Sequence, residues 1–344
     1  MGGINKMFNV KYKNMNKLSI LLVALALMVC GCASTNSTEK YHSSRDNVIN
    51  VKDKIYEIDF GDVFMSNHSA PYFVDNYLIM TDGKSTDNTI FIFDKNDYHF
   101  ITSTGHLGQG PGEIVNVGNV VDNRHGYFYV TDFGKYDILC YNIDSLLNCD
   151  GYKPYVKYRL SQTSFPSRYH YVNDTFSLGL FVNPTSVSTF TQSVGVWNMS
   201  TGDIRLLEYD NGVDNKMISL AVSEKDRIYA ECNERKDLIS LFDFDGNIKC
   251  NVFGPNKDKK SFDNFFLSLF TKDYLVAIYA GNEERGGKRY YCQVFQKNGD
   301  YVATLYLGYN AFRFAYDESN NRIVFCFNDT IQFGYLDLDE IALK

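Results

Sequence analysis

A run of apolar residues recurs at a nearly constant interval along most of this chain. The copies YLIMTD, YFYVTD, FSLGLFV, RIYAEC, YLVAIY and RIVFCF follow one another at spacings of 47 to 52 residues, counted between Leu78, Tyr127, Phe176, Ile228, Leu275 and Ile323. A steady repeat of about 40–50 residues is typical of propellers and related arrays, in which each copy is one structural unit. The chain is therefore expected to contain six such units.

Each unit divides into four strand-like segments. In the first unit these are PYFVD (71–75), YLIMTD (77–82), TIFIFD (89–94) and HFITSTG (99–105). Glycine and asparagine in the turns before the fourth segment, as in KNGD (297–300), supply hairpin geometry. Tyr and Phe, 26 of each, suit pleated and half-buried surfaces. The sequence predicts an all-β, six-bladed β-propeller with four-stranded antiparallel blades.

The last unit lacks a fourth strand. Only 21 residues follow Ile323 in a chain of 344, whereas KIYEIDF (54–60) is strand-like and belongs to no unit. We expect this N-terminal segment to supply the outer strand of the sixth blade, because closing the ring removes an exposed strand edge. The propeller domain is accordingly predicted to span residues 53–344.

The N-terminal region has a different composition. Four lysines precede the apolar run LSILLVALALMV (18–29), a pattern typical of a secretory signal and too short for a membrane span of about 20 residues. The sequence VCGC (29–32) resembles the lipobox of bacterial lipoproteins. That resemblance implies removal of residues 1–31 and lipid attachment to Cys32.

A polar segment separates the signal from the repeats. Residues 32–52 are rich in serine, threonine and asparagine and predict a flexible tether. Removing residues 1–31 takes away four lysines and no acidic residue, so the net charge changes from −7 to −11. An acidic protein of this kind is not expected to bind nucleic acid.

The segment GHLGQGPGEI (105–114) is the main glycine-rich stretch. Its glycines do not follow the G-x-G-x-x-G spacing of dinucleotide-binding loops, no Lys-Ser/Thr pair follows, and the next residues alternate like a strand. Phosphate binding is therefore not predicted. We interpret the stretch as a corner that links blades one and two, formed by Gly105, Gly108, Gly110, Pro111, Gly112 and Glu113.

The motif GQGPGE (108–113) resembles a recurrent segment of six-bladed β-propeller lipoproteins of Bacteroidota, and more loosely the NHL-type and TolB-like propellers; VFGPN (252–256) is a partial echo of it. The resemblance implies the fold and a lipid-anchored location in the cell envelope, at the outer membrane. It implies no specific activity. Acidic residues that usually direct surface export are absent between Cys32 and Glu39, which leaves the leaflet open.

Familiar catalytic and metal-binding motifs are missing from the sequence. It contains no C-x-x-C pair, no histidines spaced by two or four residues, and no G-x-S-x-G elbow, so neither a local zinc site nor a hydrolase nucleophile is predicted. The six cysteines that follow Cys32 are expected to be buried apolar residues. Cys140 and Cys149 form the closest candidate pair for a disulfide.

Ligand contacts are expected on the propeller face that carries the blade links. Candidate residues there are His106, Asp82, Asp132, Arg235 and Arg285. The two aspartates either bind a cation at the channel mouth or cap the turns that follow them. The arginines either attract an acidic glycan or peptide or are simply solvated, and His106 either faces a ligand or is solvated.

Two functions from different classes remain open at this point. The first is a non-catalytic, lipid-anchored binding module for a peptide, a glycan or an envelope protein, with no cofactor; an extracytoplasmic sensor or assembly subunit is a variant of it. The alternative is a metal-dependent, lactonase-like hydrolase or lyase, with a divalent cation such as calcium in the channel. The alternative requires at least three inward Asp, Glu, Asn or His ligands from different blades.

Overall fold

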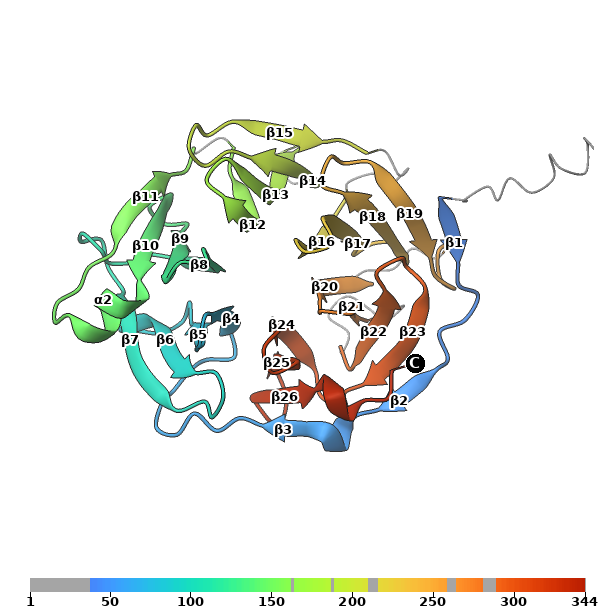
Figure 1. Cartoon of the computed structure of the whole chain (residues 1–344), viewed down its shortest axis with the longest axis horizontal. Coiled ribbons are helices and arrows are strands. Elements are labelled where there is room, and N and C mark those ends of the chain that lie inside the picture. Colours follow the sequence, from blue (N-terminus) through green and yellow to red (C-terminus); the bar gives the residue numbers. More distant parts are fainter. Residues whose placement is uncertain are drawn as a thin grey trace, which may run out of the picture. The chain divides into compact units, whose positions relative to one another are not determined.

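The computed structural model describes residues 38–343 except 162–163, 187–188, 210–215, 259–263 and 281–288. Six antiparallel sheets surround a central axis, each with one edge strand innermost (Figure 1). The predicted six-bladed β-propeller is therefore confirmed. Among the described residues, no helix is both long and apolar enough to cross a membrane.

Every blade has four antiparallel strands, which follow one another from the axis outward. Blades 1 to 3 contain β4 (Ala70–Val74), β5 (Tyr77–Thr81), β6 (Asn88–Asp94) and β7 (Phe100–His106); β8 (Val117–Asp122), β9 (Tyr127–Asp132), β10 (Asp137–Asn142) and β11 (Tyr155–Arg159); and β12 (Pro166–Asn173), β13 (Phe176–Pro184), β14 (Phe190–Trp197) and β15 (Ile204–Leu207). Blades 4 to 6 contain β16 (Ile218–Ser223), β17 (Ile228–Asn233), β18 (Leu238–Asp243) and β19 (Ile248–Phe253); β20 (Phe265–Phe270), β21 (Tyr274–Tyr279), β22 (Tyr291–Gln296) and β23 (Tyr301–Tyr306); and β24 (Ala311–Asp317), β25 (Arg322–Phe327), β26 (Phe333–Asp337) and β3 (Ile55–Glu57). The short helix α2 (Ile143–Asn148) lies between β10 and β11.

Burial explains why the repeated apolar runs are nearly continuous. The middle strands of a blade are covered on both faces by the neighbouring blades, so all six residues of β17 are buried. Six hydrophobic clusters of described residues fill the spaces between successive blades, including the space between blades 6 and 1. Each blade is therefore held by its neighbours rather than by a core of its own.

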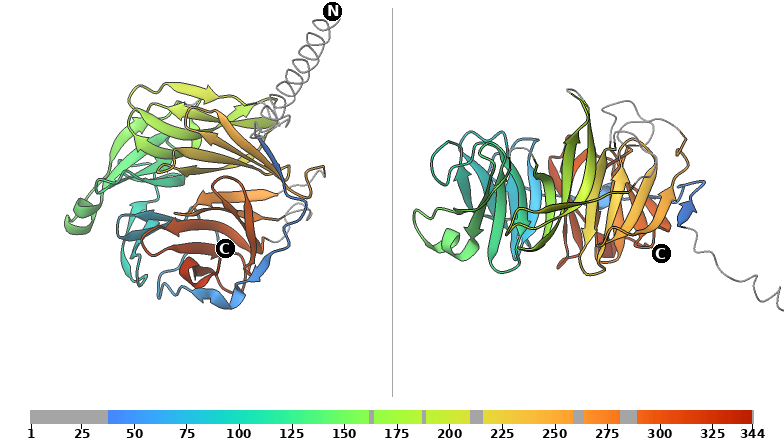
Figure 2. Two further views of the ribbon diagram at one scale, coloured as in Figure 1. Left: turned by 45° about the vertical axis from the view of Figure 1, so that its right-hand side comes forward. Right: turned by 90° about the horizontal axis from the view of Figure 1, so that it is seen from above.

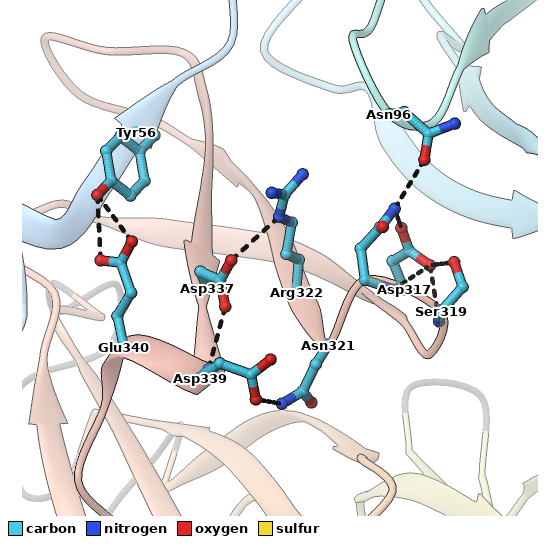
Figure 3. A network of polar contacts seen from close by, with 10 residues as sticks. Tyr56, Asn96, Asp317, Ser319, Asn321, Arg322, Asp337, Asp339 and Glu340 are labelled. Carbon is cyan, nitrogen blue, oxygen red and sulfur yellow. Dashed lines mark hydrogen bonds and ion pairs between the residues drawn. The ribbon is translucent and has the colours of Figure 1, made fainter.

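The ring closes as the sequence predicts. β3 pairs antiparallel with β26, with Tyr56 opposite Tyr335. The Tyr56 hydroxyl donates to the Glu340 carboxylate at 2.9 and 3.1 Å, beside the 3-10 helix η3 (Leu338–Glu340) (Figure 3). Across the closure, the Asn320 amide donates to Asn96 Oδ1 of blade 1 at 3.1 Å. The closing strand is thus fixed by its ladder and by side chains on the C-terminal segment.

The flexible tether predicted for residues 32–52 is wrong for its described part. β1 (Glu39–Tyr41) pairs in parallel with β19, and β2 (Val48–Asn50) pairs in parallel with β23, so blades 4 and 5 each gain a fifth strand. Residues 39–50, called the strap below, therefore follow the outside of blades 4 and 5 before β3 completes blade 6 (Figures 1 and 2). The physical reason is that the outer strands offer unpaired backbone groups that the strap satisfies.

A buried arginine anchors the strap between blades 4 and 5. Arg45 Nη1 lies 2.5 Å from Asp237 Oδ1, and the two side chains are 3% and 0% exposed. The guanidinium carbon is 5.1 to 5.8 Å from the ring centres of Phe265, Tyr279 and Phe295. The strap is thereby held by charge and by aromatic contacts as well as by its strand pairing.

The cysteines follow the expectation for buried apolar residues, with one exception. Cys140, Cys232, Cys250, Cys292 and Cys326 are buried and free. The disulfide considered between Cys140 and Cys149 does not form: Cys140 packs between blades 2 and 3, whereas Cys149 is exposed at the end of α2. Burial raises the pKa of the Cys140 thiol, which keeps it protonated.

Candidate functional site

The glycine-rich link between blades 1 and 2 encloses a carboxylate of its own. The backbone N–H of Gly110 donates to Glu113 Oε2 at 2.6 Å, and a Cβ added to Gly108 would lie 2.1 Å from the same oxygen. Gly105 and Gly112 have φ of +70° and +79°, which side chains rarely adopt. The composition of the loop is therefore explained by its close approach to Glu113 and by two left-handed residues.

This corner also connects the two blades. Lys135, in the loop that follows β9, donates from Nζ to the carbonyl oxygens of Gly110 and Glu113 at 2.8 Å each. The partial echo at Gly254 packs in a similar way, since a Cβ there would lie 2.2 Å from Asp237 Oδ2. Both links use a glycine to bring backbone against a carboxylate.

Asp82 and Asp132 have structural partners. Asp82 is 2% exposed and accepts from Ser66 N and Oγ at 2.6 Å and from Lys84 N at 2.9 Å. Asp132 is fully buried and accepts from the backbone N–H groups of Val115, Asn116 and Gly134 at 2.9 to 3.0 Å. Each aspartate therefore ties a blade link to the turn that follows its strand.

The other candidate residues do not converge either. His106 is exposed on the outermost strand of blade 1 and lies 2.7 Å from Asp87. Arg235 is half-buried, and its Nη2 lies 3.1 Å from Met217 Sδ. Arg285 lies outside the described residues. No described pair among these five candidates is brought together in one site.

The structure instead forms a cavity on the propeller axis. A hollow of about 290 Å³ is lined by residues of all six inner strands, namely β4, β8, β12, β16, β20 and β24. The third residue of every inner strand contributes to its wall. These six residues are Tyr72, Asn119, Arg168, Leu220, Leu267 and Arg313.

The six third positions divide the wall into two arcs. Blades 6, 1, 2 and 3 contribute polar side chains, whereas blades 4 and 5 contribute Leu220 and Leu267. Among the described residues that line this cavity, none is aspartate or glutamate. Burial, and then the positive charge of Arg168, lower the pKa of Arg313. The two guanidinium groups come from opposite blades and act on one another across the cavity.

A second hollow, of about 510 Å³, continues the channel toward the opposite face of the ring. It shares His170, Val222 and Phe270 with the first cavity. Here an ion pair crosses from blade 2 to blade 4: Arg124 donates to both oxygens of Glu224 at 2.5 and 2.6 Å, and His170 Nε2 lies 3.2 Å from the same carboxylate. The His170 hydrogen bond and the Arg124 pair lower the pKa of Glu224 to about 2.

The channel arginines were not identified from the sequence, although a signal existed. Arg168 and Arg313 interrupt the aromatic inner strands SRYHYV (167–172) and AFRFAY (311–316). A charged side chain does not contribute to apolar packing between blades, so its presence there is a signal of another role. The convergence of Arg168 and Arg313 depends on the placement of blades 3 and 6 across the axis.

Comparisons with known proteins agree with this architecture. Residues 62–158, which cover blade 1, the glycine-rich link and most of blade 2, match the model of the DUF5128 family, described as a 6-bladed beta-propeller. The similarity is one of fold. No curated protein matches the chain.

Solved structures of three bacterial proteins are similar at low sequence identity. A Bacteroides fragilis protein described as exported is 16% identical, with 84% of this chain and 87% of the other covered and a TM-score of 0.50. A DUF4221 family member from Bacteroides vulgatus is 12% identical, with coverages of 82% and 94% and a TM-score of 0.55. Regucalcin from Agrobacterium tumefaciens, a calcium-binding protein, is 8% identical, with coverages of 84% and 95% and a TM-score of 0.52.

Proposed function

We propose that this protein is a non-catalytic binding module of the bacterial cell envelope, anchored through a lipid on Cys32, that holds its ligand in the central channel. The ligand is a peptide, a glycan or part of an envelope protein. The similarity to a Bacteroides protein described as exported supports an envelope location. The outer membrane is our proposal from the resemblance of GQGPGE (108–113) to propeller lipoproteins. Six residues, 33–38, separate Cys32 from the strap, a reach of at most about 25 Å.

The channel cavity is the single observation that carries this function. Ligand sites are typically concave, mostly apolar and equipped with a few convergent polar groups. The cavity of about 290 Å³ combines apolar side chains of blades 4 and 5 with polar side chains from four other blades. Its size suits a small molecule or the end of a polymer rather than a folded domain.

The same lining argues against the metal-dependent alternative. Calcium prefers oxygen ligands, especially carboxylates. Of the residue types that the alternative requires, the described lining of this cavity offers only Asn119 and His170, fewer than the three required. The Asn119 amide already donates to the Ser167 carbonyl at 2.7 Å. Residues of the required types from three blades, His170, Glu224 and Glu318, do line the second hollow, but the Glu224 carboxylate is already held by Arg124 and His170.

Channel binding is tested by filling the cavity. We would incubate the mature protein with the low-mass fraction of a native envelope digest and identify retained molecules by native mass spectrometry. Ala70→Trp places a large ring at the cavity wall, and Val156→Trp is its control on the exposed outer strand of blade 2. Retention lost only in Ala70→Trp supports the proposal; equal retention, or a melting temperature raised by calcium, overturns it.

The lipid anchor is tested separately. Cys32→Ser is expected to move the protein from the detergent phase to the aqueous phase in Triton X-114 partitioning of cells that express the full chain. Cys30→Ser, two residues earlier, is the matched control and should remain in the detergent phase. Aqueous partitioning of the unaltered chain would contradict the anchor.

A further inference from the structure

The two arcs of the channel cavity define a ligand more narrowly, and this inference rests on the proposed function. We propose that the cavity binds a small carboxylate that carries an apolar group, of the kind that the carboxyl terminus of a peptide presents. The carboxylate would lie between Arg168 and Arg313, and the apolar group would lie against Leu220 and Leu267.

The arginines lack a counter-charge within the cavity. Of the described lining residues, none is acidic, and the guanidinium of Arg168 makes no hydrogen bond or ion pair with a described residue. Arg313 uses one N–H group to donate to the Phe312 carbonyl at 2.8 Å, which leaves the other donors of its planar group. Two like charges facing one hollow repel each other unless an anion lies between them.

Arginine pairs are well suited to a planar anion. A guanidinium presents parallel N–H donors that match a carboxylate, and pairs of this kind are among the stronger hydrogen bonds in proteins. Tyr72 adds a further donor, because it lines the same cavity and its phenol hydroxyl is protonated at neutral pH; burial raises its pKa further. Both arginines exert their charge on this tyrosine, so the three groups converge on the same part of the cavity.

The apolar arc distinguishes this ligand from a simple inorganic anion. Besides Leu220 and Leu267, blades 4 and 5 contribute Val222, Leu269 and Phe270 to the wall. A fully polar ligand would leave that arc without an apolar partner, whereas a side chain next to a carboxylate would cover it. The terminal residue of a peptide has this combination of groups, and an acidic sugar lacks the apolar part.

The second hollow is less suited than the first cavity to bind the same anion. There Arg124 is paired with Glu224, whose carboxylate also lies 3.2 Å from His170, and Glu318 adds a second carboxylate to the lining. Lysines also line the second hollow, but only the first cavity combines positive charge with a described lining that contains no carboxylate.

The test measures binding of defined probes to the mature protein by calorimetry at low salt. The probes are N-acetyl-L-phenylalanine, its neutral amide, glucuronate and acetate. We expect the first to bind at least tenfold more tightly than the other three. Tighter binding of glucuronate would overturn the apolar half of the proposal, and equal binding of the amide would overturn the carboxylate half.

Variants assign the binding to the arginines. Arg168→Gln and Arg313→Gln should each weaken binding of N-acetyl-L-phenylalanine at least tenfold, and Leu267→Asn should weaken it without changing acetate binding. Arg159→Gln removes the same charge from an arginine whose side chain is 83% exposed on the outer strand of blade 2, and should have no effect. If Ala70→Trp abolishes retention of an envelope ligand while the arginine variants leave binding unchanged, this inference fails and the proposed function stands.

Discussion

Arg45 in the strap is buried and Arg313 in the channel is partly buried, and the surroundings of the two guanidinium groups differ. Arg45 has Asp237 at 2.5 Å and three aromatic rings around its guanidinium. Arg313 lines a hollow without an acidic side chain among its described residues and is exposed to the charge of Arg168. One arginine is neutralised by the fold, and the other is not.

The difference separates charges that hold the structure from charges that are available to a ligand. A buried charge is costly without a partner, so the pair of Arg45 and Asp237 must form whenever the strap docks. An arginine that lines an open hollow keeps free N–H donors, and the same charge becomes a binding group when an anion enters the hollow. The two classes should respond differently to substitution.

The strongest expected effect is on the neutralised pair. Asp237→Asn leaves the Arg45 charge buried without a counter-ion and should lower the free energy of unfolding by about 3–5 kcal/mol, measured by urea denaturation. The control is Asp137→Asn, because Asp137 lies 3.7 Å from Arg159, whose side chain is exposed. This variant should change the free energy of unfolding by less than about 0.5 kcal/mol. A loss below about 1 kcal/mol for Asp237→Asn would break the comparison.

The glycine-rich link offers a further case, in which a backbone N–H group rather than an arginine stabilises the carboxylate of Glu113. Gly108→Ala places a Cβ against Glu113 Oε2 and should cost about 1–3 kcal/mol in unfolding free energy. Gly83→Ala is the control, because its nearest neighbour would be Val117 Cγ1 at 3.9 Å. If Glu113→Ala does not relieve the cost of Gly108→Ala in the double variant, close approach to the carboxylate is not the reason for the glycine.

Glu224 and Arg124 in the second hollow are intermediate between the two classes, because they are paired but partly exposed. The stabilisation that this pair provides depends on pH. The pKa of Glu224 is lowered from about 4.5 to about 2, so folding favours its charged form. The resulting stabilisation is complete above about pH 4.5 and is lost as the pH falls toward 2. Because Glu224 is partly exposed, we expect Glu224→Gln to cost roughly 1 kcal/mol at pH 7.

This pH dependence is checked by denaturant unfolding of both proteins between pH 7 and pH 2. The stability difference between wild type and Glu224→Gln should shrink across that interval. The control is Glu318→Gln. Glu318 also lines the second hollow but makes no ion pair with a described residue. A difference that stays constant with pH would show that the Arg124 and His170 contacts do not depend on the Glu224 charge.

The smallest expected effect on stability is in the channel. In the absence of an added anion, Arg313→Gln removes one of two repelling charges and should leave the free energy of unfolding unchanged or slightly higher, by less than about 0.5 kcal/mol. Differential scanning calorimetry at low salt measures this change. A loss of more than about 2 kcal/mol would place Arg313 in the same structural class as Arg45.

Much of the fold was predictable because local pattern and global architecture agree. The repeated apolar run of β5, β9 and their equivalents identifies the middle of each blade, since those strands are buried on both faces. The strand at 54–60 was predicted to close the ring because one blade was visibly incomplete, and β3 lies in that place. The corner function of Gly108 and Gly110 followed from the failure of any phosphate-binding spacing.

The strap could not be predicted by the same means. β1 pairs Glu39 with Asn251, over 200 residues away, through backbone hydrogen bonds to an outer edge. Backbone pairing of this kind does not require alternating apolar residues, and the segment is polar. Its composition therefore indicated a tether rather than strands. The buried role of Arg45 is equally invisible, because it requires Asp237 and the rings of blade 5 to meet it.

By itself the sequence determined the number of blades, the strand that closes them and the residues of the blade corner. All three depend on residues that are close in the sequence, because the apolar pattern of a strand and the steric freedom of a glycine are local properties. The tertiary structure alone decided which charges are neutralised and which face the channel. Arg168 and Arg313 lie 145 positions apart, and only the circular arrangement of blades places their like charges around one hollow.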